Sequence, residues 1–387
     1  MDVTFQPQVL RWARERAGLS DEALASKLRV PPGQVQRWEQ TGALKLSKAE
    51  KLAAATHTPF GFLFLKEPPE DRLPIPDLRT VDDAPVRHPS PDLLETIQAM
   101  QRRQAWMRDF LIDEGAEALA FIGSATLQDQ PRVVAAAMRK TLDVQPGWAN
   151  SISTWEGALR QLREKIEAAR ILIVINGVVG NNNYRKLDPQ EFRGFVLSDR
   201  YAPLIFVNRA DATSATMFTF AHELAHLWLG ADGVSDLDPL QPQPVQQVPV
   251  ERFCNRVAAE FVVPEQELRE RWGEARQQDE PYHYLARCFK VSPIVTARRA
   301  LDTGLIARDE FFDFYNRYAE DERRKQTGSK AARRGNFWNT QNVRVGKRFG
   351  AAVVQAAREG RLLYQDAYRL TNLRGKTFDQ FARNLGY

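Results

Sequence analysis

The sequence predicts an α+β protein built from several domains. Amphipathic segments with helical spacing fill most of the chain, and short β-branched or apolar runs bounded by Gly, Asn and Pro interrupt them in the middle. We therefore expect an all-helical N-terminal domain, a central domain in which a small sheet supports a helical layer, and a mainly helical, basic C-terminal region. The 387 residues, 43% hydrophobic and 27% charged, fit two or three globular domains.

Breaks in composition indicate where these domains end. A proline-dense stretch runs from residue 68 to residue 91, and a polar stretch rich in Lys, Arg and small residues covers 326–335. Both are typical of linkers. The predicted organisation is a helical domain at 1–66, a proline-rich linker at 67–92, a central domain with helical accessory segments at 93–325, and a basic helical region at 326–387.

The first 66 residues contain short amphipathic segments joined by tight turns. Apolar residues recur at helical spacing, as at Leu24 and Leu28. Ser20 and Ser47 stand where helix N-caps are expected. The predicted helices cover residues 8–17, 20–28, 32–40 and 47–56.

The central domain combines helices with strands. Residues 93–138 again have a helical pattern, whereas 171–175 and 203–207 are short apolar runs of the kind found in strands. A helix is predicted at 213–229.

Composition also excludes some classes of protein. No apolar run approaches the ~18 residues needed to span a bilayer, so a membrane protein is not expected. Only Cys254 and Cys288 are present and no secretory leader pattern begins the chain, which favours the reducing cytoplasm over a disulfide-bonded secreted protein. The formal charge of +5 hides an uneven distribution, since residues 320–387 hold fifteen Lys or Arg against six Asp or Glu.

The most informative motif is His222-Glu223-Leu224-Ala225-His226, which lies in a stretch without helix breakers. Residues four apart lie one turn apart on the same helix face, so His222 and His226 can both bind one Zn²⁺. Glu223 lies beside that face and can act as the general base toward water that attacks a peptide bond. The alternative is a core helix with two incidental histidines, which would be costly to bury unpaired.

A catalytic zinc usually has three protein ligands, so a third is expected elsewhere. Residues 250–261 predict a second helix, and Glu251 and Asn255 share one face of it with the small Ala258. Glu260 is rotated by about 180° from that face. We predict Glu251 as the third ligand and Asn255 as a hydrogen-bond partner of a ligand. Two alternatives stay open: Glu251 as a solvated carboxylate at a helix N-terminus, and Cys254 as a competing thiolate ligand.

The remaining histidines and one loop are less informative. His57 and His88 fall in a turn and a linker, where a surface role is expected. His283 could stabilise an oxyanion at the metal site, but its position in the sequence does not place it there. The Gln/Pro-rich run at 239–249 is long enough to cover the site as a lid, although a plain loop is the simpler interpretation.

These residues resemble the ImmA/IrrE metallopeptidases. The match covers residues 171–264 and includes Gly194-Phe195, the run 202–208, the histidine motif with the residues before it, and Glu251 with Asn255 and the segment 258–264. The resemblance implies a gluzincin-like zinc domain in which His222, His226 and Glu251 bind the metal and Glu223 is the base. Members of the family characteristically cut a helix-turn-helix repressor. The chain departs from the family pattern at Cys254, where alanine is usual, and at Val257, where phenylalanine is common.

The first 66 residues resemble an XRE-type helix-turn-helix domain. Leu19-Ser20 opens its second helix, Val30 lies in the turn and residues 35–39 lie in the recognition helix, while residues 59–64 through 73–79 resemble the hinge of fused family members. Asp21 stands where a phosphate-binding glutamine is common and Arg29 where a turn glycine is usual. If the domain binds double-stranded DNA, the side chains placed to reach base edges are Gln34, Gln36 and Arg37. The alternative is an adaptor that binds another protein.

The region after residue 336 is basic and has amphipathic segments at 343–359 and 362–371. It resembles a tail found on many of these fused proteins, and its basic surface either follows a phosphate backbone or solvates a helical bundle.

Two functions follow as hypotheses. The first is a zinc endopeptidase of narrow specificity, active in transcriptional regulation, that cleaves a repressor or another regulatory partner. The second is a DNA-binding regulator, or the antitoxin partner of a toxin encoded nearby, whose zinc site is structural or sensory and not proteolytic.

Overall fold

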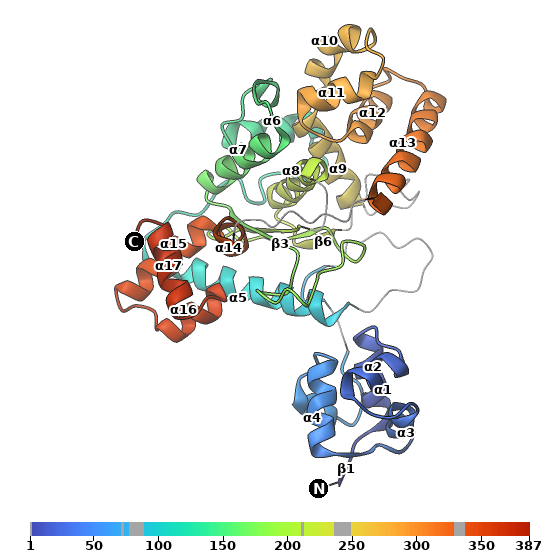
Figure 1. The fold of residues 1–387 in the computed structure, drawn as a ribbon. Coiled ribbons are helices and arrows are strands. Elements are labelled where there is room, and N and C mark those ends of the chain that lie inside the picture. The colour runs from blue at the N-terminus through green and yellow to red at the C-terminus, as the bar shows by residue number, and fades with distance from the viewer. Residues whose placement is uncertain (1, 71–72, 77–88, 210–212, 236–248, 329–336) are drawn as a thin grey trace. The chain divides into compact units, whose positions relative to one another are not determined.

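The computed structural model describes residues 2–70, 73–76, 89–209, 213–235, 249–328 and 337–387 (Figure 1). The chain divides into two compact units, one made of Met1–Pro74 and Asp83–Gln98, the other of Ile75–Asp82 and Ala99–Tyr387. The predicted domain boundaries stay a prediction. Most of the predicted proline-rich linker lies outside the described residues.

The N-terminal unit holds the four predicted helices, within one or two residues at most ends. They are α1 (Pro7–Arg16), α2 (Asp21–Leu28), α3 (Gln34–Thr41) and α4 (Leu46–Ala55), followed by the 3₁₀ helix η1 (Phe60–Phe64). The unit is not entirely helical, because β1 (Asp2–Thr4) pairs antiparallel with β2 (Ala43–Lys45). Ser20 caps α2 by accepting a hydrogen bond from the Ala23 amide. The prediction for Ser47 was wrong, since α4 begins one residue before it.

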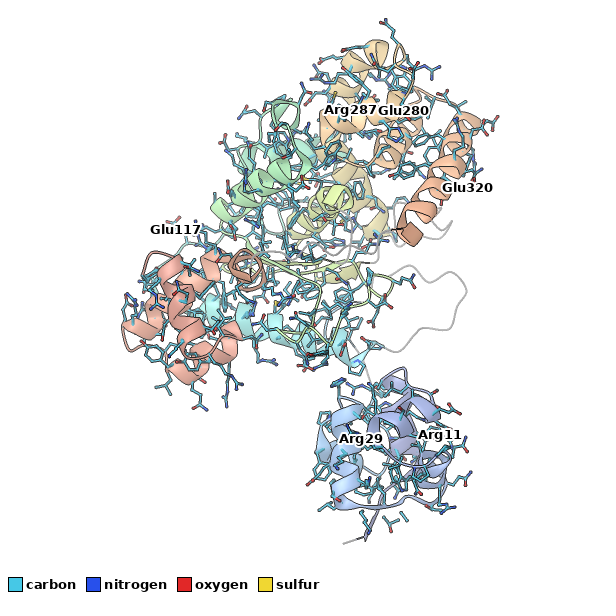
Figure 2. The ribbon with its side chains drawn as sticks, in the orientation of Figure 1. Arg11, Arg29, Glu117, Glu280, Arg287 and Glu320 are labelled. Carbon is cyan, nitrogen blue, oxygen red and sulfur yellow. The ribbon has the colours of Figure 1, made fainter. Side chains whose placement is uncertain are left out.

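The connection between α2 and α3 has a left-handed residue at each end. Arg29, labelled in Figure 2, ends α2 with φ 52°, and Gly33 precedes α3 with φ 79°. The two helices then bury apolar residues against α1 and α4 in one core cluster that includes Leu24, Leu28, Val35 and Trp38. This is a helix-turn-helix arrangement.

A four-stranded mixed sheet lies at the centre of the second unit, with strand order β3-β5-β4-β6. The predicted strands are β3 (Leu172–Asn176) and β5 (Leu204–Asn208), which pair in parallel. The sequence did not predict β4 (Gly194–Leu197), antiparallel to β5, or β6 (Gly233–Ser235), antiparallel to β4. Both are very short, and β4 is buried on both faces, so neither shows the polar alternation of a half-exposed strand.

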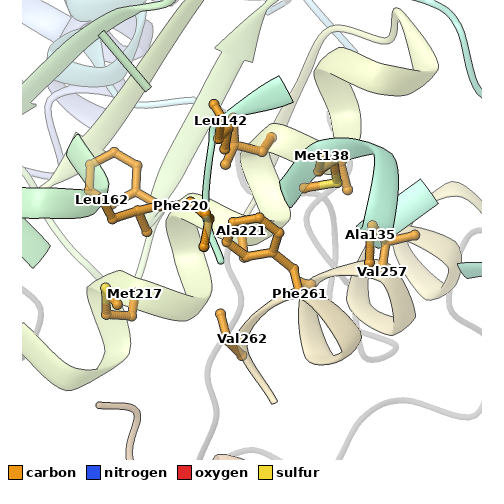
Figure 3. Close-up of a cluster of buried hydrophobic side chains, with 14 of the residues drawn as sticks. Ala135, Met138, Leu142, Leu162, Met217, Phe220, Ala221, Val257, Phe261 and Val262 are labelled. Atoms are coloured by element: carbon orange, nitrogen blue, oxygen red, sulfur yellow. The ribbon is translucent and has the colours of Figure 1, made fainter. Parts of the chain in front are cut away.

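Helices cover this sheet and build the main core. The helix α8 (Thr213–Leu229) contacts β4, β5 and the helix α9 (Pro249–Val262). Figure 3 shows Phe220 of α8 among side chains from α9, from α6 (Pro131–Thr141) and from α7 (Trp155–Ala168). The helical pattern at 93–138 is two helices, α5 (Pro91–Asp113) and α6, joined by turns.

A further helical layer follows α9. It contains α10 (Glu265–Ala275), α11 (Pro281–Phe289), α12 (Pro293–Asp302) and α13 (Arg308–Gly328), and a short 3₁₀ helix η2 (Trp148–Ser151) contacts α11. Because α13 runs to Gly328, the first part of the predicted linker at 326–335 is helical, and the rest lies outside the described residues. No helix in the described ranges is long and apolar enough to cross a bilayer.

The basic C-terminal region is folded onto the second unit. It consists of α14 (Phe337–Val345), α15 (Lys347–Arg358), α16 (Tyr364–Thr371) and α17 (Lys376–Asn384). The predicted segment at 343–359 is interrupted at Gly346, which has φ 87° and whose Cα lies so close to β3 that a Cβ would stand 2.8 Å from the Ile173 carbonyl oxygen. Arg103 of α5 donates to the carbonyl oxygens of Leu370 and Arg344, at 2.8 and 2.9 Å, and so ties α5 to the ends of α16 and α14.

Candidate metal centre

The histidine motif lies in the middle of α8, a helix whose residues 217–229 contain no Gly or Pro. His222, Glu223 and His226 are all buried. The one-turn spacing points both imidazoles to the same side, and their Nε2 atoms are 2.9 Å apart. Two ring nitrogens at this distance cannot both carry a proton facing the other.

The helix α9 brings a carboxylate to the same point. The Glu251 oxygens lie 3.2 Å from His222 Nε2 and 3.1 Å from His226 Nε2, and Glu251 is buried. The small Ala225 of α8 and Ala258 of α9 are both fully buried in the core cluster that joins these helices. Small side chains permit the close approach that lets Glu251 reach the histidines.

These three side chains fit a divalent metal ion. Their donor atoms all lie within 4.8 Å of one another, and two imidazoles with one carboxylate are a ligand set that zinc accepts. Three lone-pair donors that converge in a buried place repel each other unless a proton or cation lies among them. In the described part of the chain, this is the one such His, Cys, Asp and Glu group.

Charge around Glu251 favours its ionised form. Burial raises the pKa of its carboxyl group, but the charges and hydrogen bonds of His222 and His226 outweigh burial and lower that pKa to about 2. The group is therefore an anion at neutral pH, as a metal ligand must be.

Asn255 orients one of the histidines. Its Oδ1 lies 3.1 Å from His222 Nδ1, one helical turn from Glu251 on α9. An amide oxygen accepts only, so this contact keeps the proton of His222 on Nδ1 and leaves the Nε2 lone pair for a metal.

Glu223 lies outside the three-donor group, beside strand β4. A Cβ at Gly194 would stand 2.8 Å from Glu223 Oε1, so the missing side chain at 194 makes room for this carboxylate. The sequence motif contained Gly194 but gave no reason for it. The reason depends on the packing of α8 on β4, which no local pattern reveals.

The alternative ligands are placed elsewhere. Cys254 is buried outside the three-donor group, and burial, followed by the charges of Glu251 and Glu223, raises the pKa of its thiol well above the usual value. Glu260, on the other face of α9 as predicted, is paired with Arg299 of α12. Neither side chain competes with Glu251.

The other histidines are also separate from this group. His283 lies on α11 between Glu280, 3.8 Å away, and the rings of Phe314 and Tyr318. His57 lies in the turn after α4. His88 and residues 239–248 of the Gln/Pro run fall outside the described residues.

In the N-terminal unit, α3 exposes Gln36 and Arg37, while Gln34 is half-buried. Asp21 does not carry an isolated charge, since its carboxylate lies 2.8 Å from Arg14 Nε. Arg14 also holds the buried Glu39 with two hydrogen bonds of 2.6 and 3.0 Å. The negative charge of Asp21, which stands where a phosphate-binding glutamine is common, is thus balanced by Arg14 of the same domain.

The fold and the buried His-His-Glu group define a helix-turn-helix protein joined to a domain of metallopeptidase type. Comparison with family models agrees. Residues 10–63 match the helix-turn-helix family, residues 169–301 match a peptidase family described as the IrrE N-terminal-like domain, and residues 345–384 match a domain of unknown function, DUF8813. No curated protein matches the chain. The chain combines an XRE-type helix-turn-helix domain with an ImmA/IrrE-like domain, the fusion that the motifs predict.

Proposed function

We propose that the chain is a zinc-dependent endopeptidase of narrow specificity that acts in transcriptional regulation. The observation that carries the proposal is the convergence of His222, His226 and Glu251 within 4.8 Å beside Glu223. The three side chains would hold Zn²⁺, which polarises the scissile carbonyl and makes water more acidic when bound. A helix-turn-helix repressor is the expected substrate, because the peptidase-type domain is fused to a domain of that kind.

In this proposal Glu223 and Asn255 each have a separate role in the reaction. Glu223 accepts a proton from the water that attacks the carbonyl carbon and passes it to the amine nitrogen as the C–N bond breaks. Its buried position beside Gly194 keeps bulk water from competing for that proton. Asn255 holds His222 in the tautomer that leaves Nε2 free.

In the test, the zinc-loaded wild-type protein and the zinc-loaded Glu223→Gln variant are each incubated with candidate repressors. These include any repressor encoded next to this protein. Cleavage, followed by mass spectrometry of the fragments, should fall by a factor of about 100 or more when the base is removed. Glu164→Gln, which changes an exposed carboxylate of α7, is the matched control and should cleave normally. Cleavage that survives Glu223→Gln removes the assignment of the base.

A second function is favoured by the N-terminal unit. The exposed Gln36 and Arg37 of α3, together with the compensation of Asp21 by Arg14, suit a DNA-binding regulator whose metal site is structural or sensory and whose protein partner is a repressor or a nearby-encoded toxin. Binding to its own promoter should weaken with salt, weaken in Arg37→Ala and be unchanged in Glu223→Gln. No specific binding to promoter DNA at moderate ionic strength would exclude this function.

A further inference from the structure

The connection between α16 and α17 has the same design as the connection between α2 and α3. Each first helix has eight residues, α2 ending at a left-handed Arg29 with φ 52° and α16 at a left-handed Asn372 with φ 56°. Each second helix follows a glycine of positive φ, Gly33 at 79° and Gly375 at 47°, and has eight or nine residues.

The buried positions of the two pairs also coincide when they are counted from the left-handed residue. In the N-terminal pair, Val35 and Trp38 are buried six and nine positions after Arg29. In the C-terminal pair, Phe378 and Phe381 are buried six and nine positions after Asn372. The same side of the second helix therefore faces the core in both.

The first helices agree in the same way. Five positions before the left-handed residue stand the buried Leu24 and Ala367, and one position before it stand the buried Leu28 and Thr371. A supporting helix precedes each pair. For α16 and α17 it is α15, and its Gly350 lies so close to Phe381 that a Cβ would stand 2.6 Å from the ring.

The exposed side of α17 carries the polar side chains that such a helix presents to DNA. Lys376 and Arg383 are exposed and Gln380 is half-buried; the three recur at i, i+4 and i+7, and the exposed Asp379 lies on the same side. Arg374 in the turn is exposed near Lys376, and neither makes an ion pair among the described residues. Over residues 341–387 there are nine Lys or Arg against three Asp or Glu.

We infer that α15–α17 form a second helix-turn-helix unit that binds double-stranded DNA through α17. The basic turn and the first residue of α17, Arg374 and Lys376, contact phosphates, and the exposed side of α17 lies against the major groove. The site is independent of the zinc centre and of the exposed face of α3.

The experiment uses the full chain with Gln36→Ala and Arg37→Ala, so that the remaining DNA binding does not come from α3. Fluorescence anisotropy is measured with a labelled mixed-sequence duplex over a series of salt concentrations. The test variant combines Arg374→Gln, Lys376→Gln and Arg383→Gln. The control removes the same number of charges elsewhere in the second unit, at the exposed Arg132, Lys140 and Arg160.

The test variant should bind the duplex about tenfold or more weakly. The slope of its log binding constant against log salt concentration should fall by the amount expected for the loss of about two to three phosphate contacts, while the control changes little. Asp379→Asn should tighten binding severalfold, because it removes the carboxylate from the DNA-facing side, and a misfolded protein cannot produce that gain. Equal weakening by the test and control variants overturns the inference. So does an absence of duplex binding in the Gln36→Ala, Arg37→Ala protein.

Discussion

At the scale of single residues, the candidate metal centre depends on positions that carry no charge. Gly194 leaves space for the Glu223 carboxylate, and Ala225 and Ala258 are buried in the core cluster that joins α8 and α9. Asn255 selects the tautomer of His222. Small or uncharged neighbours therefore set the positions of the carboxylates and imidazoles in this site.

Gly194→Ala tests the proposed role of Glu223 as the base. The added Cβ would lie 2.8 Å from Glu223 Oε1 and 3.0 Å from the Phe206 carbonyl oxygen, so the carboxylate must move. We expect peptide cleavage to fall by up to about 100-fold. Zinc content, measured by plasma emission spectroscopy, should stay at the wild-type level because the three donors are untouched. Loss of zinc in this variant would mean that Gly194 supports the ligands and not the base.

The low pKa of Glu251 predicts an acid-labile site. Its folded pKa of about 2 lies below the usual 4.5, so the ionised group stabilises the folded state above pH 4.5 and this contribution is lost as pH falls toward 2. The metal-free protein should therefore lose thermal stability across that range. Calorimetry of Glu251→Gln should show a smaller decrease over the same range, and an identical decrease would contradict the assignment.

At the scale of elements, left-handed residues decide where helices end. Arg29 ends α2 and Asn372 ends α16, positions where glycine has no steric cost. A non-glycine residue there is strained, so the turn after α2 forms at a cost to stability that the usual glycine would avoid.

Arg29→Gly should stabilise the N-terminal unit. It relieves a left-handed conformation that costs about 1 kcal/mol for a residue with a side chain, and the Arg29 side chain is exposed, so no buried contact is lost. Urea unfolding should show a gain of about 0.5–1 kcal/mol. Lys27→Gly, inside α2, is the opposite control and should cost about 1 kcal/mol. A loss of stability in Arg29→Gly would show that its side chain has a structural role.

At the scale of the whole molecule, the C-terminal helices belong to the second unit because Arg103 and the contact of Gly346 with β3 attach them to its centre. Burial and, to a lesser extent, the neighbouring charge of Arg102 lower the pKa of Arg103 to about 10, so the group keeps its proton at neutral pH. Its two carbonyl contacts and the Phe349 ring, 5.5 Å away, replace the water it has lost.

Arg103→Ala should destabilise the second unit. The change leaves the carbonyl oxygens of Leu370 and Arg344 without this donor, and a cavity where the side chain was. We expect a loss of about 2–4 kcal/mol in chemical unfolding. Arg102→Ala, at an exposed position beside it, should change stability by less than about 0.5 kcal/mol. Equal effects of the two changes would show that the carbonyl contacts of Arg103 contribute nothing.

Periodicity and motif spacing predicted the long helices, the strands β3 and β5, and the shared face of His222 and His226, because these depend on residues close in sequence. They missed β1, β2, β4 and β6, which are short and form only where a partner strand is present.

The sequence by itself determined the local geometry of the candidate site, since two histidines one turn apart beside a glutamate specify their own arrangement on any helix. Only the tertiary structure decided which distant groups join them. Glu251 reaches the histidines because α9 packs closely on α8, Gly194 meets Glu223 because α8 packs on β4, and the C-terminal segment becomes part of the second unit through Arg103. Contacts between residues far apart in the chain are set by how helices and strands pack, and no local pattern contains that information.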